Sequence, residues 1–369
     1  MYLSISFSFY EVKDVNFAYK FPAVRGIQAG KEYYISMVPM KFLPKLFPTD
    51  IDIVLPEYRA QRRINEIRIP EIKKYILDNR NTYVFSALSA SIDGNFEFIS
   101  VDNTNKDIGI LEVDMESVFL INDGQHRKAA IEAAMNEDAS IGEETISVVF
   151  FKDDGLARSQ QMFTDLNKHA VKTSNSLSTL YDSRDLMAVA TKEVIEKVEF
   201  FKKYTDKERD ILGKNSSNLF TLNNLYKANS RIIHTKDCTD DDILFLVEYW
   251  SIVANNISEW NELLSRTLTK KDLRENYIIT LAITINALGR LGRFFYDNRK
   301  LPMEKYLRNL SQIDWLRSNI DNWGGRTIRD NGKIMNNEEA VILTCSKIKQ
   351  LIGIELSKEE LNKEKSIYL

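Results

Sequence analysis

The sequence predicts an α+β protein in which a mixed α/β domain is followed by a mainly α-helical domain. In the first half, Val118–Ile121 and Ile146–Phe151 are short β-rich runs, and polar and apolar residues alternate over Ser4–Phe9. From about residue 173 the apolar residues recur at helical spacing instead. We therefore expect two domains, 1–175 and 176–369.

The first domain should combine strands with two helices. Apolar residues keep helical spacing over Ile64–Asn79, with a break or a new start at Pro70. Small and apolar residues predict a second helix over Lys128–Met135. Asp93-Gly94 is typical of a hairpin turn, and it stands before the strand-like run Phe96–Ile99.

Start and stop signals delimit the helices of the second domain. Thr205 with Glu208 matches a capping box, and Thr239 and Thr269 each precede a helical pattern. Gly353 follows the last long apolar stripe and is expected to end a helix. The longest apolar stretch falls well short of the roughly 20 residues that cross a bilayer. These patterns predict a cytoplasmic protein without a membrane span.

Composition narrows the function classes. The chain has 369 residues, a formal net charge of −3, two cysteines and three histidines. An acidic balance argues against a protein that coats nucleic acid over its whole surface, although local basic patches remain compatible with it. The cysteines and histidines lack metal-ligand spacing, so no metal site is expected.

The pentapeptide Asp123-Gly124-Gln125-His126-Arg127 joins a strand-like run to a helix-like run. Asp123 is expected to cap the helix, and Gly124 permits a backbone path that a Cβ would hinder. The helix start and the Arg127 guanidinium both suit a phosphate, and His126 has the pKa range of a proton donor or acceptor. Asp-Gly is also ordinary turn chemistry, so a purely structural cap is the alternative.

Several Arg and Lys clusters suit phosphates as well, although charge runs are more often solvated faces. Asn167, Lys168 and Lys172 could contribute to the phosphate site of the pentapeptide. The predicted DNA-contacting residues fall in three groups: Arg62, Arg63 and Arg68; Lys202, Lys203 and Arg209; and Arg326 and Arg329.

The pentapeptide resembles the signature of DGQHR-domain proteins, which belong to the wider ParB/sulfiredoxin-like group. The blocks Phe21–Gln28, Tyr33-Tyr34 and Gln61–Asn65 resemble the DndB family of the DNA phosphorothioate (sulfur) modification systems. The resemblance covers most of the first 180 residues. It implies a ParB/sulfiredoxin-like first domain and a protein that binds double-stranded DNA as an accessory or regulator of the modification genes.

The resemblance leaves two other functions open. As an NTPase, the chain would bind a nucleoside triphosphate with Mg²⁺ through Gly124 and Arg127, and Asp123, Gln125 and His126 would act in catalysis. As an interaction subunit, it would use the pentapeptide only as a structural cap. Other modification proteins and a second copy of the chain are expected as partners.

Overall fold

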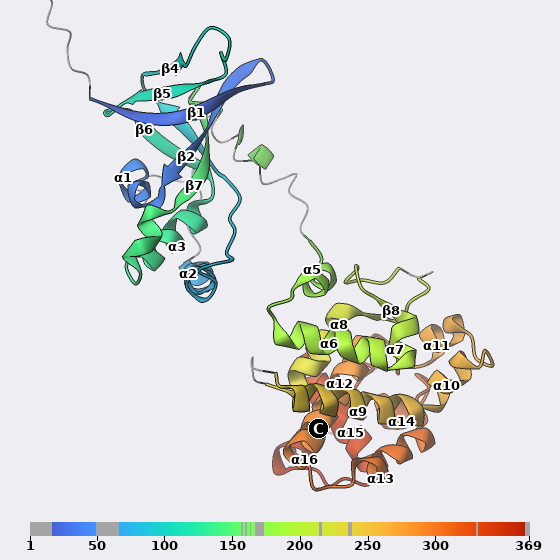
Figure 1. Cartoon of the computed structure of the whole chain (residues 1–369). Coiled ribbons are helices and arrows are strands. Elements are labelled where there is room, and N and C mark those ends of the chain that lie inside the picture. The colour runs from blue at the N-terminus through green and yellow to red at the C-terminus, as the bar shows by residue number, and fades with distance from the viewer. Residues whose placement is uncertain are drawn as a thin grey trace, which may run out of the picture. The chain divides into compact units, whose positions relative to one another are not determined.

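The computed structural model describes residues 17–48, 66–155, 158, 161–162, 164–166, 173–213, 216–234, 238–329 and 331–365. The predicted strand at Ser4–Phe9 and the start of the predicted helix at Ile64 lie outside these residues. Contacts divide the chain into two compact units, Met1–Val171 and Lys172–Leu369, here called the N-terminal and C-terminal units (Figure 1). The first contains the sheet and the second is mainly helical, so the α+β class is confirmed.

A seven-stranded mixed sheet forms the N-terminal unit, in the spatial order β4-β5-β1-β2-β7-β3-β6. All neighbouring strands are antiparallel except β3 and β7, which are parallel. The strands are β1 (Ala18–Gln28), β2 (Lys31–Pro39), β3 (Leu88–Asp93), β4 (Phe96–Ser100), β5 (Ile108–Asp114), β6 (Val118–Asp123) and β7 (Thr145–Lys152).

Three helices cover the buried face of this sheet: α1 (Leu43–Leu46), α2 (Ile69–Asp78) and α3 (Gln125–Met135). Figure 1 shows them together on one side of the strands. Alternation in the strands supplies the sheet's part of the core, because Val148 and Phe150 are fully buried while their neighbours along β7 are not. Ile76 of α2 and Ile131 of α3 pack into the same cluster. Short 3-10 segments accompany these elements at Met40–Phe42, Glu66–Arg68, Ala139–Glu143 and Arg308–Gln312.

The predicted hairpin at Asp93-Gly94 is wrong in its pairing. β3 and β4 do follow each other through this turn, with Gly94 at φ +138°, yet they are not hydrogen-bonded to each other. Both edges of β3 are already occupied, by β6 and β7, so β4 pairs with β5 at the other end of the sheet. A local turn signal shows that the chain changes direction, but it does not show which strands pair.

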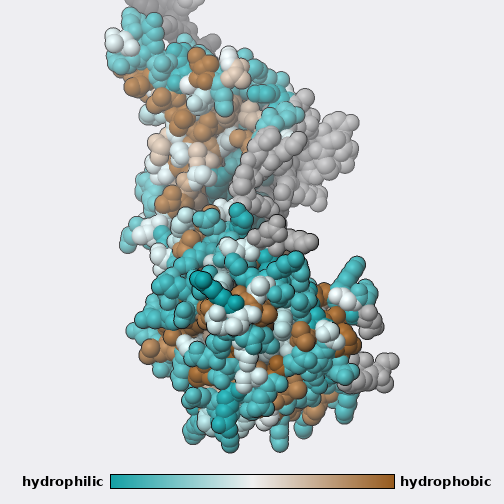
Figure 2. All heavy atoms as spheres, turned by 90° about the vertical axis from the view of Figure 1, so that its right-hand side faces the viewer, coloured by the Kyte–Doolittle hydropathy of each residue, from teal (hydrophilic) through white to brown (hydrophobic). Residues whose placement is uncertain are grey.

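One face of the N-terminal unit exposes apolar side chains. Val24 and Ile35 are opposite each other on β1 and β2, and both remain substantially exposed, as does Met37. Figure 2 shows hydrophobic residues gathered on one side of this unit among hydrophilic ones. Exposed apolar side chains are normal on the surfaces of folded proteins.

The C-terminal unit packs its helices around a large aromatic core. Trp250 and Trp260 are fully buried, and Trp315 and Trp323 stack with ring centres 5.4 Å apart. A two-residue pair, β8 (Thr205–Asp206) and β9 (Phe220–Thr221), adds the only strands among the described residues of this unit. The helices are α5 (Asn175–Tyr181), α6 (Leu186–Lys197), α7 (Glu199–Tyr204), α8 (Leu222–Ile232), α9 (Asp240–Asn256), α10 (Ser258–Leu264), α11 (Lys270–Asn276), α12 (Ala282–Asp297), α13 (Met303–Leu307), α14 (Ile320–Trp323), α15 (Glu338–Ile352) and α16 (Lys358–Lys365).

The helix signals of the sequence are confirmed with one exception. Thr239 forms a capping box with Asp242, Thr269 caps α11, and Gly353 ends α15 in the left-handed conformation. Thr205 begins no helix, because it lies in β8. The carboxylate of Asp206 accepts from the Glu208 N–H, which the expected capping box would have held, and from the Arg209 N–H. Within the described ranges, no helix has both the length and the apolar character that a membrane crossing requires.

Candidate functional site

The pentapeptide forms the predicted strand-to-helix turn. β6 ends at Asp123, and α3 begins at Gln125. Gly124 lies between them at φ +105°, which L side chains rarely adopt. A Cβ on Gly124 would also lie 2.4 Å from Cδ2 of Leu88. Both the backbone angle and the space therefore demand glycine.

Arg127 reaches back across this turn rather than away from the fold. Its Nη1 donates to the carbonyl oxygens of Ser86 at 2.6 Å and Ala87 at 2.9 Å, in the segment that leads into β3. Its Nη2 donates to Oδ2 of Asp123 at 2.6 Å. The guanidinium is mostly buried, with 15% of the side chain exposed. These bonds join the start of α3 to the ends of two strands.

The expected cap by Asp123 is wrong. Gly124 occupies the N-cap position, and this cap has no side-chain hydrogen bond. The carboxylate of Asp123 pairs with Arg127 instead, four residues further on, where it meets a full positive charge. The carboxylate keeps 44% of its side chain exposed, so it lies at the surface end of the turn.

The other members of the motif are turned into the fold to different degrees. Gln125 is buried, and its amide lies 3.5 Å from the carbonyl oxygen of Ile121, whereas His126 is half-buried. Lys128, which sequence reasoning missed, is 4% exposed and forms an ion pair with Glu132 at 2.8 Å. The catalytic roles expected for Asp123, Gln125 and His126 stay predictions.

Asn122, just before the motif, is a second residue that sequence reasoning missed. It is fully buried, and its Nδ2 donates to Oγ of Ser91 at 2.8 Å and lies 3.1 Å from Sδ of Met162. Its Oδ1 and the Oγ of Ser89 have no hydrogen-bond partner among the described residues. The sequence alone does not show that Asn122, at the end of an apolar run and beside a turn, is buried.

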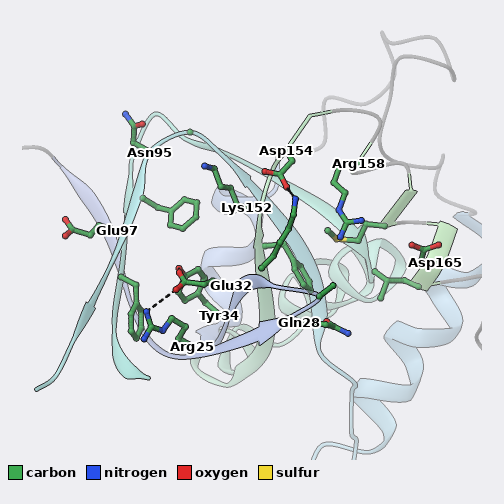
Figure 3. Close-up of a pocket in the computed structure, with 18 residues that line it drawn as sticks. Arg25, Gln28, Glu32, Tyr34, Asn95, Glu97, Lys152, Asp154, Arg158 and Asp165 are labelled. Carbon is green, nitrogen blue, oxygen red and sulfur yellow. Dashed lines mark hydrogen bonds and ion pairs between the residues drawn. The ribbon is translucent and has the colours of Figure 1, made fainter. Parts of the chain in front are cut away.

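A cavity of about 1000 Å³ opens at the other end of β3 and β7, beside the β1–β2 hairpin (Figure 3). Among the described residues, none of the site residues predicted from the sequence lines it. The lining comes from β1, β2, β4, the end of β7 and the following segment: Arg25, Gln28, Ala29, Lys31, Glu32, Tyr34, Gly94, Asn95, Phe96, Glu97, Phe98, Phe151, Lys152, Asp154, Arg158, Met162, Asp165 and Leu166. Met162 also contacts Asn122, so the cavity wall reaches the residue before the motif.

One side of the cavity is fixed by mutual hydrogen bonds. The Tyr34 hydroxyl donates to Oε2 of Glu32 at 2.7 Å, and Nη1 of Arg25 donates to Oε1 of the same carboxylate at 3.1 Å. Burial, followed by the bond to Glu32, raises the pKa of Tyr34, so this phenol stays neutral at physiological pH. Arg25 also binds Asp107 and lies over the ring of Phe98, 5.5 Å from its centre. Arg25 thus bonds to two carboxylates, so this group keeps a net negative charge.

The opposite side carries an excess of positive charge. Figure 3 shows Lys152, Asp154 and Arg158 along this side. Lys31 donates to the Asp154 carboxylate, and this bond, together with the charges of Lys31, Lys152 and Arg158, lowers the pKa of Asp154. Three cations thus surround one carboxylate.

A comparison with family models decides the family. The model of DndB, described as DNA-sulfur modification-associated, matches residues 21–355, which is most of the chain. The chain belongs to the DndB family. No curated protein and no solved structure matches it. The finer grouping with DGQHR-domain and ParB/sulfiredoxin-like proteins stays a prediction.

The predicted DNA-contacting residues differ in exposure and in ion pairing. Arg68, Lys203, Arg209 and Arg329 are exposed, and none has a carboxylate within ion-pair distance among the described residues. Lys202 instead pairs with Glu196 at 3.1 Å. Five predicted residues lie outside the described residues: Arg62, Arg63, Asn167, Lys168 and Lys172.

Arg326 cannot contact DNA in this fold, which corrects the prediction. It is 3% exposed, and its Nη2 donates to Oε2 of Glu364 at 2.6 Å. Its Nη1 donates to the carbonyl oxygen of Asn322 at 3.3 Å. A Gly-Gly-Arg loop suggested an exposed cation, but the guanidinium joins α14 to α16. Across the described ranges, no cluster of His, Cys, Asp and Glu could hold a metal ion.

Proposed function

We propose that this DndB-family chain is a DNA-binding accessory protein of a DNA sulfur modification system that controls transcription of the modification genes. Other proteins of the same system would be its partners. Family membership supports the association with DNA sulfur modification. The DNA-binding role is our inference from the charge distribution.

The observation that carries this proposal is the pairing state of the cations. Some exposed cations are paired with carboxylates, as in the Lys197–Glu193 and Lys202–Glu196 ion pairs. Lys203, in the last turn of α7, and Arg209 are both exposed and have no such partner in the described part of the chain. In a chain of net charge −3, unneutralised cations so close in sequence suit phosphates that repeat along a duplex.

The backbone around Arg209 is held in place by hydrogen bonds. Its N–H donates to Oδ1 of Asp206 at 2.8 Å, and its carbonyl oxygen accepts from the hydroxyl of Ser176 at 2.8 Å. Only the side chain is left to be ordered by a ligand, which lowers the entropic cost of a phosphate contact. NTP turnover at the pentapeptide has weaker support, since Arg127 already binds two carbonyl oxygens and Asp123.

Fluorescence anisotropy with two duplexes of equal length tests this proposal. One duplex carries the sequence upstream of the modification genes, and the other is unrelated. We expect both to bind and the upstream duplex to bind more tightly, because phosphate contacts position a protein while base contacts select the site. A reporter gene behind the upstream sequence should be repressed or activated by the protein.

Two double variants make the test specific. Lys203→Ala with Arg209→Ala should lower the affinity for both duplexes by the same factor. Lys197→Ala with Lys363→Ala removes the same charge from side chains that are paired with Glu193 and Glu359, so it should have little effect. Absence of duplex binding by folded wild-type protein at low salt would refute the proposal.

A further inference from the structure

The cavity beside the β1–β2 hairpin has the chemistry of a ligand site distinct from the pentapeptide. Of the residues that the structure describes, four cations (Arg25, Lys31, Lys152 and Arg158) and four carboxylates (Glu32, Glu97, Asp154 and Asp165) line it, in two sets. Arg25, Glu32 and Asp107 are bonded to one another on one side, and Asp165 accepts from the side-chain amide of Gln161 at 2.7 Å. These bonds hold the shape of the cavity, while Glu97 and Asp165 keep their negative charges in its lining.

The second set is under-neutralised. Lys152, the last residue of β7, and Arg158 are exposed, and neither has a carboxylate partner within ion-pair distance in the described part of the chain. Asp154 is already bonded to Lys31. A second anion placed between Lys152 and Arg158 would balance the charge there, and an ammonium beside a guanidinium is a common pair for a phosphate.

Aromatic rings line the same cavity. Phe96 and Phe98 are half-buried on β4, and both pack against Tyr34, with ring centres 5.8 Å and 5.3 Å apart. Phe151, next to Lys152, is a third half-buried ring in the lining. Rings that are partly exposed and supported from behind provide flat apolar surfaces on which a base can stack. The volume of about 1000 Å³ lies at the upper end of the range for small-molecule sites.

We propose that this cavity binds a nucleoside phosphate, with its phosphates at Lys152 and Arg158 and its base against Phe96 and Phe98. The aromatic side selects a ligand with a planar body, and the cationic side selects a ligand with a negative tail. The site is separate from the pentapeptide turn and does not use the cations assigned to DNA.

Isothermal titration calorimetry of the full chain with ATP, GTP and CTP tests the proposal, with pyrophosphate and a short oligothymidylate as further probes. At least one nucleotide should bind, and more tightly than pyrophosphate. Lys152→Ala with Arg158→Ala should lower the affinity for that nucleotide by at least about tenfold. Lys20→Ala with Lys41→Ala is the matched control, because both lysines are exposed in the same unit and paired with Glu112 and Glu143.

Phe96→Leu separates base recognition from phosphate recognition. It should weaken nucleotide binding while leaving pyrophosphate binding unchanged, and the retained pyrophosphate binding shows that the variant is folded. The proposal is overturned if folded wild-type protein binds none of the nucleotides, or if the Lys152/Arg158 variant binds them as well as wild type does. It is equally overturned if pyrophosphate binds as tightly as the nucleotides, or if only the oligonucleotide binds.

Discussion

Arg127 and Asp123, the last and first residues of the pentapeptide, form an ion pair across the start of α3, with 2.6 Å between Nη2 and Oδ2. The same guanidinium binds the carbonyl oxygens of Ser86 and Ala87. The motif thereby fastens β6, α3 and the segment before β3 to one another. This structural role explains why an arginine is needed at this position even without a bound ligand.

Arg127→Ala should therefore destabilise the N-terminal unit. Two carbonyl oxygens and one carboxylate would lose their donor, and hydrogen bonds that involve a charged group contribute about 1.5–3 kcal/mol each. We expect urea denaturation to show a loss of at least about 1.5–3 kcal/mol in the free energy of unfolding, and Lys20→Ala, an exposed and paired control, to show almost none. Wild-type stability combined with lost nucleotide or DNA binding would instead make Arg127 a ligand-binding residue.

Gly124→Ala should also destabilise the chain, by about 1–3 kcal/mol or more, because strained backbone and overpacking add. Gly155→Ala is a matched control. Gly155 has a similar φ of +101°, but nothing lies within 4 Å of the added Cβ. The difference in melting temperature between the two variants measures the crowding of the added Cβ, mainly against Leu88 and also against the Arg127 guanidinium. Equal melting temperatures would show that the contact with Leu88 relaxes at little cost.

Arg326 and Arg329 are three residues apart, but alanine substitution should destabilise the protein strongly at Arg326 and hardly at all at Arg329. Arg326→Ala leaves Glu364 buried without a partner, which costs about 3–5 kcal/mol. Arg329 is exposed, so its loss should change stability by less than about 0.5 kcal/mol. Chemical denaturation of both variants checks the assignment. A stable Arg326→Ala variant with weakened DNA binding would restore the sequence-based prediction for this residue.

Acid should release α16 from the C-terminal unit. Burial raises the pKa of Glu360, but bonds from Lys349 at 2.7 Å and from the Ser357 N–H outweigh it, so the pKa is lowered overall. A lowered folded-state pKa contributes stability above the unfolded value of about 4.3, and this stability is lost as pH falls through the folded value. The free energy of unfolding, measured with urea from pH 7 to pH 3, should fall more steeply for wild type than for Glu360→Gln. Parallel curves would contradict this linkage.

The sequence predicted the secondary structure where the signal was local. The turn at Gly124, the caps at Thr239 and Thr269 and the end of α15 at Gly353 all depend on neighbouring residues. Strand pairing was not predictable in the same way, because the partner of β4 is set by which sheet edges are already occupied. Asp123 shows the same limit: a cap and an ion pair with Arg127 are both compatible with its position in sequence.

The cavity could not be predicted at all. Arg25, Phe96, Lys152 and Arg158 come from separate segments, and only the order of strands in the sheet brings them together. Exposure was equally hidden, since Arg326 and Arg329 lie in one Arg-bearing loop and differ completely in burial. Whether a cation is free to bind phosphate depends on carboxylates elsewhere in the fold, such as Glu364 from α16.

The salt dependence of duplex binding tests the central claim, that unneutralised cations of the C-terminal unit contact DNA phosphates. The logarithm of the affinity should fall linearly with the logarithm of salt concentration, with a slope of roughly −0.9 per phosphate neutralised. Lys203→Ala with Arg209→Ala should flatten that slope by nearly two units, roughly 0.9 for each cation removed. The Lys197→Ala and Lys363→Ala control should keep the wild-type slope. Identical slopes for wild type and the Lys203/Arg209 variant would contradict the claim.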